Sequence, residues 1–257
     1  MSSRPANDMS AARVHIAMLT HNALQFSEAC LHSLIAHGGE GCEIMVLDNA
    51  SEDGTREWLA ARCLPNLHVM LSPINLGVPK GRNRLLAMTL PVTQPEDFIV
   101  FMDNDVEVLP GWQTPFVELF AREPAAGIAG VTGHDILVQE DRRELLPSPE
   151  AGSVRVDVVS GYCLWVRGSV ASALGPFDEN LGLFWHEDDD YCVRAIGLGY
   201  DVYALPGTNV VHHRHKSGAA NEVEMEELSR RNQSYLVAKW RQLDIVDGGG
   251  RIVRRAL

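Results

Sequence analysis

Short apolar segments alternate with segments of helical periodicity over the first hundred residues of this chain. The apolar segments, such as VHIAML at 14–19, are rich in the β-branched and aromatic residues that favour strands. Strand–helix alternation of this kind is typical of a parallel sheet with right-handed crossover connections. We therefore predict strands at 14–19, 42–47, 67–72 and 98–102, and helices at 23–37, 55–63 and 79–90.

Polar residues follow each of the four predicted strands. Because the carboxyl ends of parallel strands meet at one edge of a sheet, and ligands bind there, these residues together outline a binding crevice. Taken singly, each is equally consistent with a turn or a helix cap. The groups are Thr20-His21-Asn22, Asp48-Asn49-Ala50-Ser51, Asn75-Leu76-Gly77 and Asp103-Asn104-Asp105.

The fourth group carries the most chemical information. The apolar run that begins at Phe98 stops at two aspartates that bracket an asparagine. An unpaired carboxylate is costly to bury, so Asp103 and Asp105 should face water, a cation or a polar ligand. An Asx-type turn remains the alternative at this point.

The second half of the chain has a different character. A helix is expected near 112–122, then strands and loops over 127–166 with a charged insert at 139–150. A helix should begin near Glu187, a strand near Asn209, and a long helix should span 222–242. No linker separates domains, so we predict one domain at 14–242, with halves at 14–110 and 111–242 and tails at 1–13 and 243–257.

Composition limits the functional class. The chain has 257 residues, and 46% of them are hydrophobic, which is enough for a core. A net charge of −12 argues against nucleic acid as a partner. No apolar run approaches the roughly 20 residues of a membrane span, and the first residues lack a secretory signal. The scattered cysteines have no metal-ligand spacing. We expect a cytoplasmic protein without an integral membrane segment.

The motifs resemble those of the inverting, metal-dependent glycosyltransferases of family 2, over about 14–240. This resemblance implies an α/β GT-A fold: a single Rossmann-like, mostly parallel central sheet flanked by helices, with a smaller acceptor-side region of sheet and loops. The similar blocks, which occur in the family's order, are LTHN (19–22), VLDNASEDGT (46–55), NLGVPKGRNRLL (75–86), DND (103–105) and the long block at 160–200 that contains Glu187-Asp188.

The resemblance assigns the donor side of the site. It implies a nucleotide-diphospho-sugar donor, with UDP- or dTDP-sugars favoured, and a divalent cation that accepts diphosphate oxygens along with carboxylates. Asp105 is the expected metal ligand, joined by Asp103 and by a histidine after a late strand. His212, His213 and His215 are candidates, and we choose His212 because it closes an apolar strand. An imidazole ligand favours Mn²⁺ over Mg²⁺. The expected nucleotide-binding residues are Thr20, Asn22, Asp48, Asn75, Arg82, Asn83, Asp103 and Asn104.

The resemblance also assigns the acceptor side. Direct displacement with inversion needs a base near the acceptor nucleophile, and Asp188 of the Glu-Asp pair is our choice. Trp185, Glu187, Gly161 and Tyr162 are the expected acceptor-binding residues. The acids at 187–190 also suit a first helical turn, and Asp190 is spaced to pair with Arg194.

Several questions remain open from sequence. The Gln-x-x-Arg-Trp motif of processive members is missing, so a hexosyl- or deoxyhexosyltransferase that adds one sugar is expected. The expected acceptor is a glycan, a lipid-linked sugar, a natural product or a peptide. The sequence is compatible with either a monomer or an oligomer. A nucleotidyltransferase that makes sugar nucleotides and a non-catalytic sugar-nucleotide-binding module are the alternatives. Two further hypotheses are a lid at 213–221 and a peripheral membrane contact through Arg251, Arg254 and Arg255.

Overall fold

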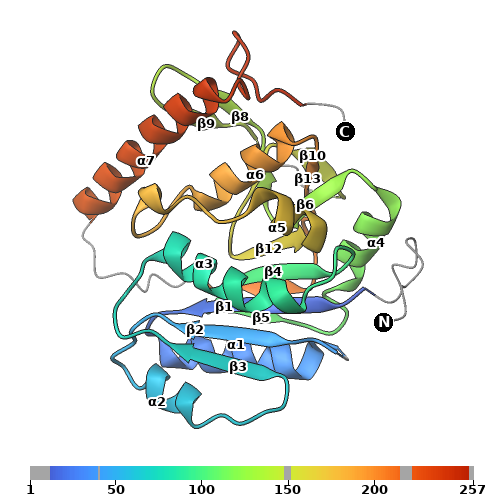
Figure 1. Cartoon of the computed structure of the whole chain (residues 1–257), viewed down its shortest axis with the longest axis vertical. Helices are drawn as coiled ribbons and strands as arrows, with labels where there is room; N and C mark the ends of the chain where they lie inside the picture. Colours follow the sequence, from blue (N-terminus) through green and yellow to red (C-terminus); the bar gives the residue numbers. More distant parts are fainter. Residues whose placement is uncertain (1–11, 40, 148–151, 215–221, 255–257) are drawn as a thin grey trace.

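The computed structural model describes residues 12–39, 41–147, 152–214 and 222–254 (Figure 1). Its centre is an eight-stranded sheet in the order β10-β13-β6-β12-β4-β1-β2-β3. Strands β3 (Leu67–Leu71), β2 (Ile44–Asp48), β1 (Val14–Thr20) and β4 (Phe98–Asp103) run parallel to one another. In register, Thr20 pairs with Asp48 and Leu19 pairs with Asp103, so the polar ends of these strands lie at one level.

The other half of the sheet is mixed. Strand β12 (Cys163–Arg167) is antiparallel to both β4 and β6 (Ala126–Gly130). Strand β13 (Asp201–Ala204) is parallel to β6, and β10 (Val154–Val156) completes the edge. Three small two-stranded sheets surround it: β5 (Val106–Val108) with β14 (Val210–His212), β7 (Gly133–His134) with β11 (Val158–Val159), and β8 (Ile136–Val138) with β9 (Arg143–Leu145).

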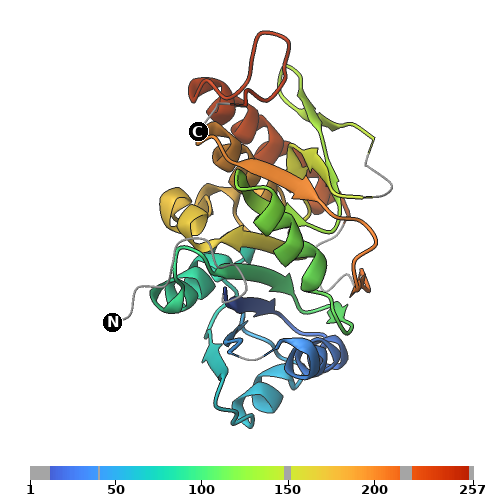
Figure 2. The ribbon, with the colours of Figure 1, turned by 90° about the vertical axis from the view of Figure 1, so that its right-hand side faces the viewer.

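Helices cover both faces of the sheet (Figures 1 and 2). One face carries α1 (Leu24–His37), α2 (Thr55–Ala60) and α4 (Thr114–Arg122); the other carries α3 (Val78–Thr89), α5 (Gly168–Leu174), α6 (Glu187–Gly197) and α7 (Glu222–Gln242). Two 3-10 turns lie at Leu90–Val92 and Glu179–Leu181. Neighbouring residues of β4 alternate between the two cores, as the two-residue period of a strand requires.

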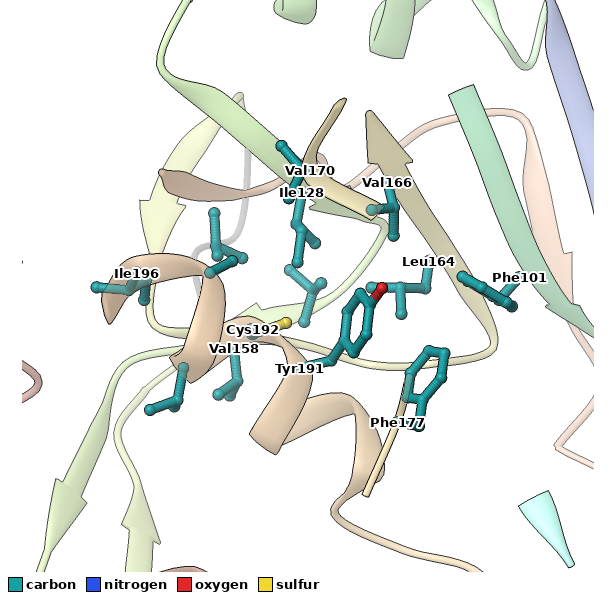
Figure 3. Packing of buried hydrophobic residues seen from close by; sticks show 14 of the residues in the cluster. Phe101, Ile128, Val158, Leu164, Val166, Val170, Phe177, Tyr191, Cys192 and Ile196 are labelled. Atoms are coloured by element: carbon teal, nitrogen blue, oxygen red, sulfur yellow. The ribbon is translucent and has the colours of Figure 1, made fainter. Parts of the chain in front are cut away.

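Aromatic packing fixes helix α6 against the sheet (Figure 3). Tyr191 stacks on Phe177 with ring centroids 4.1 Å apart, and Phe177 meets Phe101 of β4 edge-on at 5.0 Å. All three rings are buried. Because α6 begins at Glu187, this packing determines where the acids of its first turn lie relative to the end of β4.

The elements agree with the sequence-based predictions apart from α5, β5 and β13, which were not expected, and α2, which ends at Ala60 and not at the predicted Cys63. The predicted C-terminal tail differs more. Ile245 and Ile252 are buried in the core beneath α7, and Arg254 lies 2.6 Å from Asp157. Described residues 243–254 thus pack on the domain through apolar side chains and one arginine ion pair. Arg254 therefore binds Asp157 within the protein, whereas a contact with a membrane was expected. Arg255, His215 and most of the predicted lid lie outside the described residues. None of the described helices is both long and apolar enough to cross a bilayer.

Candidate active site

The two aspartates after β4 have different surroundings. The Asp103 side chain is 39% exposed, and one of its oxygens lies 3.3 Å from the guanidinium of Arg82. The Asp105 side chain is 8% exposed and lies 3.3 Å from Nε2 of His212. The structure therefore brings the predicted metal pair, Asp105 and His212, into contact.

Strand pairing explains how His212 reaches this position. Strand β14 runs antiparallel to β5, and His212 stands opposite Val106, the residue after Asp105. The imidazole stacks on the Tyr162 ring with centroids 4.2 Å apart. Its neighbour His213 instead pairs with Glu107 at 2.7 Å. His212, the histidine chosen from the sequence, thus lies against Asp105, whereas the His213 imidazole lies against Glu107.

Asn104 connects the end of β4 to the loop after β1. Its side-chain amide lies within hydrogen-bond distance of Thr20 Oγ1 (3.1 Å), the Asn22 carbonyl (3.0 Å) and Ser27 Oγ (2.9 Å). Asn22 in turn accepts a hydrogen bond from the Glu52 amide at 2.8 Å. Asn104 and Thr20 are buried, and their side chains contact each other between the end of β4 and the loop after β1. Their role in nucleotide binding stays a prediction.

Asp48, at the end of β2, is completely buried beneath Arg56. The Arg56 guanidinium lies 3.3 Å from the carboxylate and donates to the Ser72 carbonyl at 2.6 Å. Asn75 is exposed nearby, and its side-chain oxygen accepts from the Gly77 amide. Arg56 was not singled out from sequence, because a lone arginine after a strand-end motif resembles any solvated helix residue.

Arg82 connects the donor side to the acceptor side. It is 2% exposed and lies 3.3 Å from Asp103 and 3.1 Å from Glu187. It also donates to the Gly161 carbonyl at 2.9 Å. A Cβ atom on Gly161 would lie 2.6 Å from the guanidinium, so only glycine allows this approach. Arg82, which was predicted to bind the nucleotide, thus bridges two acids in this structure.

Asp188 lies next to this bridge. Its carboxylate accepts hydrogen bonds from the Gly161 amide at 2.7 Å and from the Asp189 amide at 2.9 Å. Gly161 therefore links Arg82 to Asp188, because its carbonyl accepts a hydrogen bond from Arg82 and its amide donates one to Asp188. As a whole residue, Asp188 is half-buried.

The four acids in the first turn of α6 have separate partners. Glu187 pairs with Arg82, Asp189 with Arg143 and His186, and Asp190 with Arg194 as predicted from the sequence. Among the residues that the structure describes, Asp188 is the member of this turn without an ion pair.

The same arrangement sets the acidities. Burial and the neighbouring charge of Asp189 raise the pKa of Asp188 above its ordinary value, against the opposing charge of Arg82. Burial likewise raises the pKa of Glu187. For Asp189, burial is outweighed by Arg143 and His186, which lower its pKa. A raised aspartate pKa suits a group that accepts a proton near neutral pH.

The remaining predicted residues divide between the site and the scaffold. Trp185 is 37% exposed beside the first turn of α6 and is free to contact a ligand surface. Asn83 binds both the amide and the carbonyl of Phe177 and so braces α3 against the acceptor half. Arg143 and Asn232 were missed, since isolated polar residues on an insert or a long helix give no sequence signal. His186 directly precedes the predicted acids, but the sequence did not indicate its contact with Asp189.

The family model for glycosyl transferase family 2 matches residues 15–150, more than half of the chain. The chain belongs to glycosyl transferase family 2. The matched residues include all four strand-end groups, and α6 with its acids lies beyond them.

Curated relatives of this family 2 member come from two bacteria. An N-acetylglucosaminyl-diphospho-decaprenol L-rhamnosyltransferase of Mycobacterium tuberculosis is 26% identical in an alignment 239 positions long; the match covers 79% of this chain and 77% of the relative. Uncharacterized protein y4gI of Sinorhizobium fredii is 23% identical in an alignment 266 positions long; the match covers 91% of this chain and 28% of that protein.

Solved structures show the fold of this family 2 member. GalNAc-T7, crystallised with UDP, GalNAc and Mn²⁺, matches with a TM-score of 0.70 and 14% identity over 93% of this chain and 50% of that one. Staphylococcus aureus TarS matches with a TM-score of 0.57 and 17% identity over 77% of this chain and 36% of its own. The present chain thus spans half or less of each solved protein. The fold is the GT-A fold, α/β with a mostly parallel central sheet.

Proposed function

We propose that this protein transfers one sugar from a nucleotide-diphospho-sugar to a hydroxyl of its acceptor, with inversion. The observation that carries the proposal is the continuous contact from Asp103 through Arg82 and Gly161 to Asp188. This contact supports a single site that includes the strand-end acid Asp103 and the α6 carboxylate of Asp188. Family membership supports the sugar-transfer chemistry.

The donor set fits a divalent cation. Asp105 supplies an oxygen and His212 a nitrogen, and the partly exposed Asp103 lies at the same sheet edge. Among the described residues, no cluster of three or more His, Cys, Asp or Glu side chains is arranged as a complete metal site. A cation that bridges substrate phosphates needs only one or two protein ligands, so this incomplete set is adequate. When bound, it would neutralise charge on the leaving diphosphate, and the imidazole favours Mn²⁺.

Asp188 is the proposed base. Its carboxylate takes the proton of the acceptor hydroxyl while that oxygen bonds to the anomeric carbon of the donor sugar. The bond from this carbon to the diphosphate oxygen breaks, and the nucleoside diphosphate leaves with the electron pair. The amides of Gly161 and Asp189 orient the carboxylate for this step.

We further propose a deoxyhexose or hexose donor on UDP or dTDP and a lipid-linked sugar acceptor on the cytoplasmic side of a membrane. The mycobacterial relative is named as a rhamnosyltransferase that acts on a lipid diphosphate sugar. Two apolar side chains of the loop before α6, Leu183 and Trp185, are 50% and 37% exposed, which suits an acceptor with an apolar portion.

Thermal unfolding with UDP, dTDP, GDP, CDP and ADP, each with and without Mn²⁺, tests the donor side. One nucleotide should raise the unfolding temperature in a Mn²⁺-dependent manner. Its sugar conjugates are then assayed with N-acetylglucosaminyl diphosphate on a short prenyl chain, and nucleoside diphosphate release is measured. If none of the nucleotides binds, the proposal is contradicted. Release of pyrophosphate from a nucleoside triphosphate and a sugar phosphate would also contradict it, because that reaction is nucleotidyl transfer.

A further inference from the structure

The loop immediately before α6 has an unusual backbone. Trp185 and His186 are consecutive non-glycine residues in the left-handed region, with φ of 76° and 71°. Side chains with a Cβ rarely adopt this conformation, and it persists only where surrounding contacts enforce it. Because α6 begins at the next residue, Glu187, this turn sets the direction in which the first helical turn starts.

Asn232, on helix α7, supplies the enforcing contacts. It is 1% exposed, and its side-chain nitrogen lies 3.1 Å from the Trp185 carbonyl, 3.2 Å from that of Phe184 and 2.9 Å from that of Leu181. Its side-chain oxygen accepts from the Arg231 guanidinium at 2.8 Å. A cation on the oxygen polarises the amide and makes its N–H groups stronger donors.

Two neighbours on α7 hold the same loop. Ser229 Oγ lies 2.9 Å from Nε2 of His186, and Arg231 donates to the Leu181 carbonyl at 3.1 Å. The far end of α7 is docked by different contacts, since Trp240 Nε1 donates to the buried carboxylate of Asp190 at 3.1 Å. The docking of the helix and the restraint of the loop can therefore be perturbed separately.

We propose that Asn232 is a positioning residue for the acceptor. By binding three carbonyls of the loop, it holds the Trp185–His186 turn and thereby fixes both the indole of Trp185 and the carboxylate of Asp188. The donor side is built from β1, β2, β4, β5 and β14, none of which Asn232 contacts through its side chain. This assignment rests on the proposed function, which gives Asp188 and Trp185 their acceptor roles.

Asn232→Ala is the test variant, and Asn232→Ser, which keeps one donor, is the second should the first fail to fold. Trp240→Phe is the matched control, because it weakens α7 docking and leaves the loop contacts intact. Transfer is assayed with the sugar conjugate of the nucleotide identified by thermal unfolding and with the short-chain N-acetylglucosaminyl diphosphate acceptor. In this assay Asn232→Ala should lower kcat/KM for the acceptor roughly 10- to 100-fold. The dissociation constant of the nucleoside diphosphate should remain within about twofold of wild type. Asn232→Ser should be intermediate.

Amide hydrogen exchange of the unliganded protein provides a second test of the positioning role, and this test does not depend on sugar transfer. Asn232→Ala and Asn232→Ser should both accelerate exchange over 181–186 while β1, β2 and β4 remain protected. Trp240→Phe, which loses a contact with Asp190, should not affect 181–186. Unchanged exchange over 181–186 in the Asn232 variants would overturn the positioning role even if no nucleotide binds and the proposed function fails. If the enzyme is active and both Asn232→Ala and Trp240→Phe lower kcat/KM for the acceptor by the same factor, the positioning role is overturned as well.

Discussion

The guanidinium of Arg82 lies 3.1 Å from the carboxylate of Glu187, and both side chains are almost entirely buried. Arg82 belongs to α3, in the nucleotide-side half, and Glu187 opens α6, in the acceptor-side half. This ion pair joins the two halves of the site. A second contact from Arg82 to Asp103 extends the connection to the end of β4.

Arg82→Met should destabilise the protein by about 3–5 kcal/mol, because it leaves a buried acid without its cation. The loss should be greater near pH 9 than near pH 6, since a protonated Glu187 needs no cation. Urea unfolding at both pH values measures this. Arg84→Met, an exposed position on the same helix, is the control and should change stability by less than about 0.5 kcal/mol. Equal effects of the two substitutions would show that the bridge does not matter.

Asp105→Asn and His212→Ala should each abolish Mn²⁺-dependent stabilisation by the nucleoside diphosphate and reduce transfer at least about 100-fold. His213→Ala is the matched control, because the His213 imidazole pairs with Glu107, whereas His213 binds the Asp105 carbonyl through its backbone amide, which alanine keeps. Its activity and metal response should be close to wild type. Chelation should abolish transfer, and Mn²⁺ should restore more activity than Mg²⁺. If His213→Ala alone lost the metal response, the choice between the histidines would be reversed.

Transfer should decline in acid as Asp188 takes up a proton. Because burial and Asp189 raise the pKa of Asp188, the acid limb of kcat/KM should lie above the value of about 4 for an ordinary aspartate. The active ionised form is present above this pKa and is lost as pH falls through it. Asp189→Asn removes the neighbouring charge and should move the limb to lower pH. A limb that moves upward in this variant would contradict the electrostatic account.

Asp178 should contribute to stability at neutral pH. Burial raises the pKa of its carboxylate, but hydrogen bonds from Lys239 and Tyr235 outweigh this and lower the pKa to about 2. Since the folded pKa lies below the unfolded value, the stabilisation is present above the unfolded pKa and is lost as pH falls toward 2. Asp178→Asn should cost about 1 kcal/mol near pH 7, because solvent screens part of the interaction, and little near pH 2. Thermal unfolding of the two proteins across this range measures the difference, and a pH-independent cost would refute the assignment.

The parallel half of the fold could be predicted because β1, β2 and β4 are continuous apolar segments, each closed by Asp, Asn or Thr. Periodicity and strand-end chemistry together locate such strands. Helix α5 could not be predicted in this way, since GSVASAL is short and nearly neutral in helix signals. The packing of residues 243–254 depends on contacts with distant segments, which local sequence does not encode.

The candidate site divides in the same manner. The contact of Asp105 with His212 follows the predicted pairing, although the residues are far apart in sequence. The assignment of Asn104 and Asn83 to the nucleotide could not anticipate that their amides would bind within the protein. The bridge made by Arg82 depends on the absence of a side chain at Gly161, and the restraint by Asn232 comes from another helix. Both are three-dimensional contacts without a local pattern.

The central claim is that Asp188 is the base of a sugar transfer at this site. Asp188→Asn preserves shape and removes the proton acceptor, so the dissociation constant of the nucleoside diphosphate should stay within about twofold while kcat for transfer falls about 100- to 10,000-fold. Titration calorimetry and single-turnover transfer on the same preparations measure the two quantities. Retained transfer with intact nucleotide binding would contradict the account.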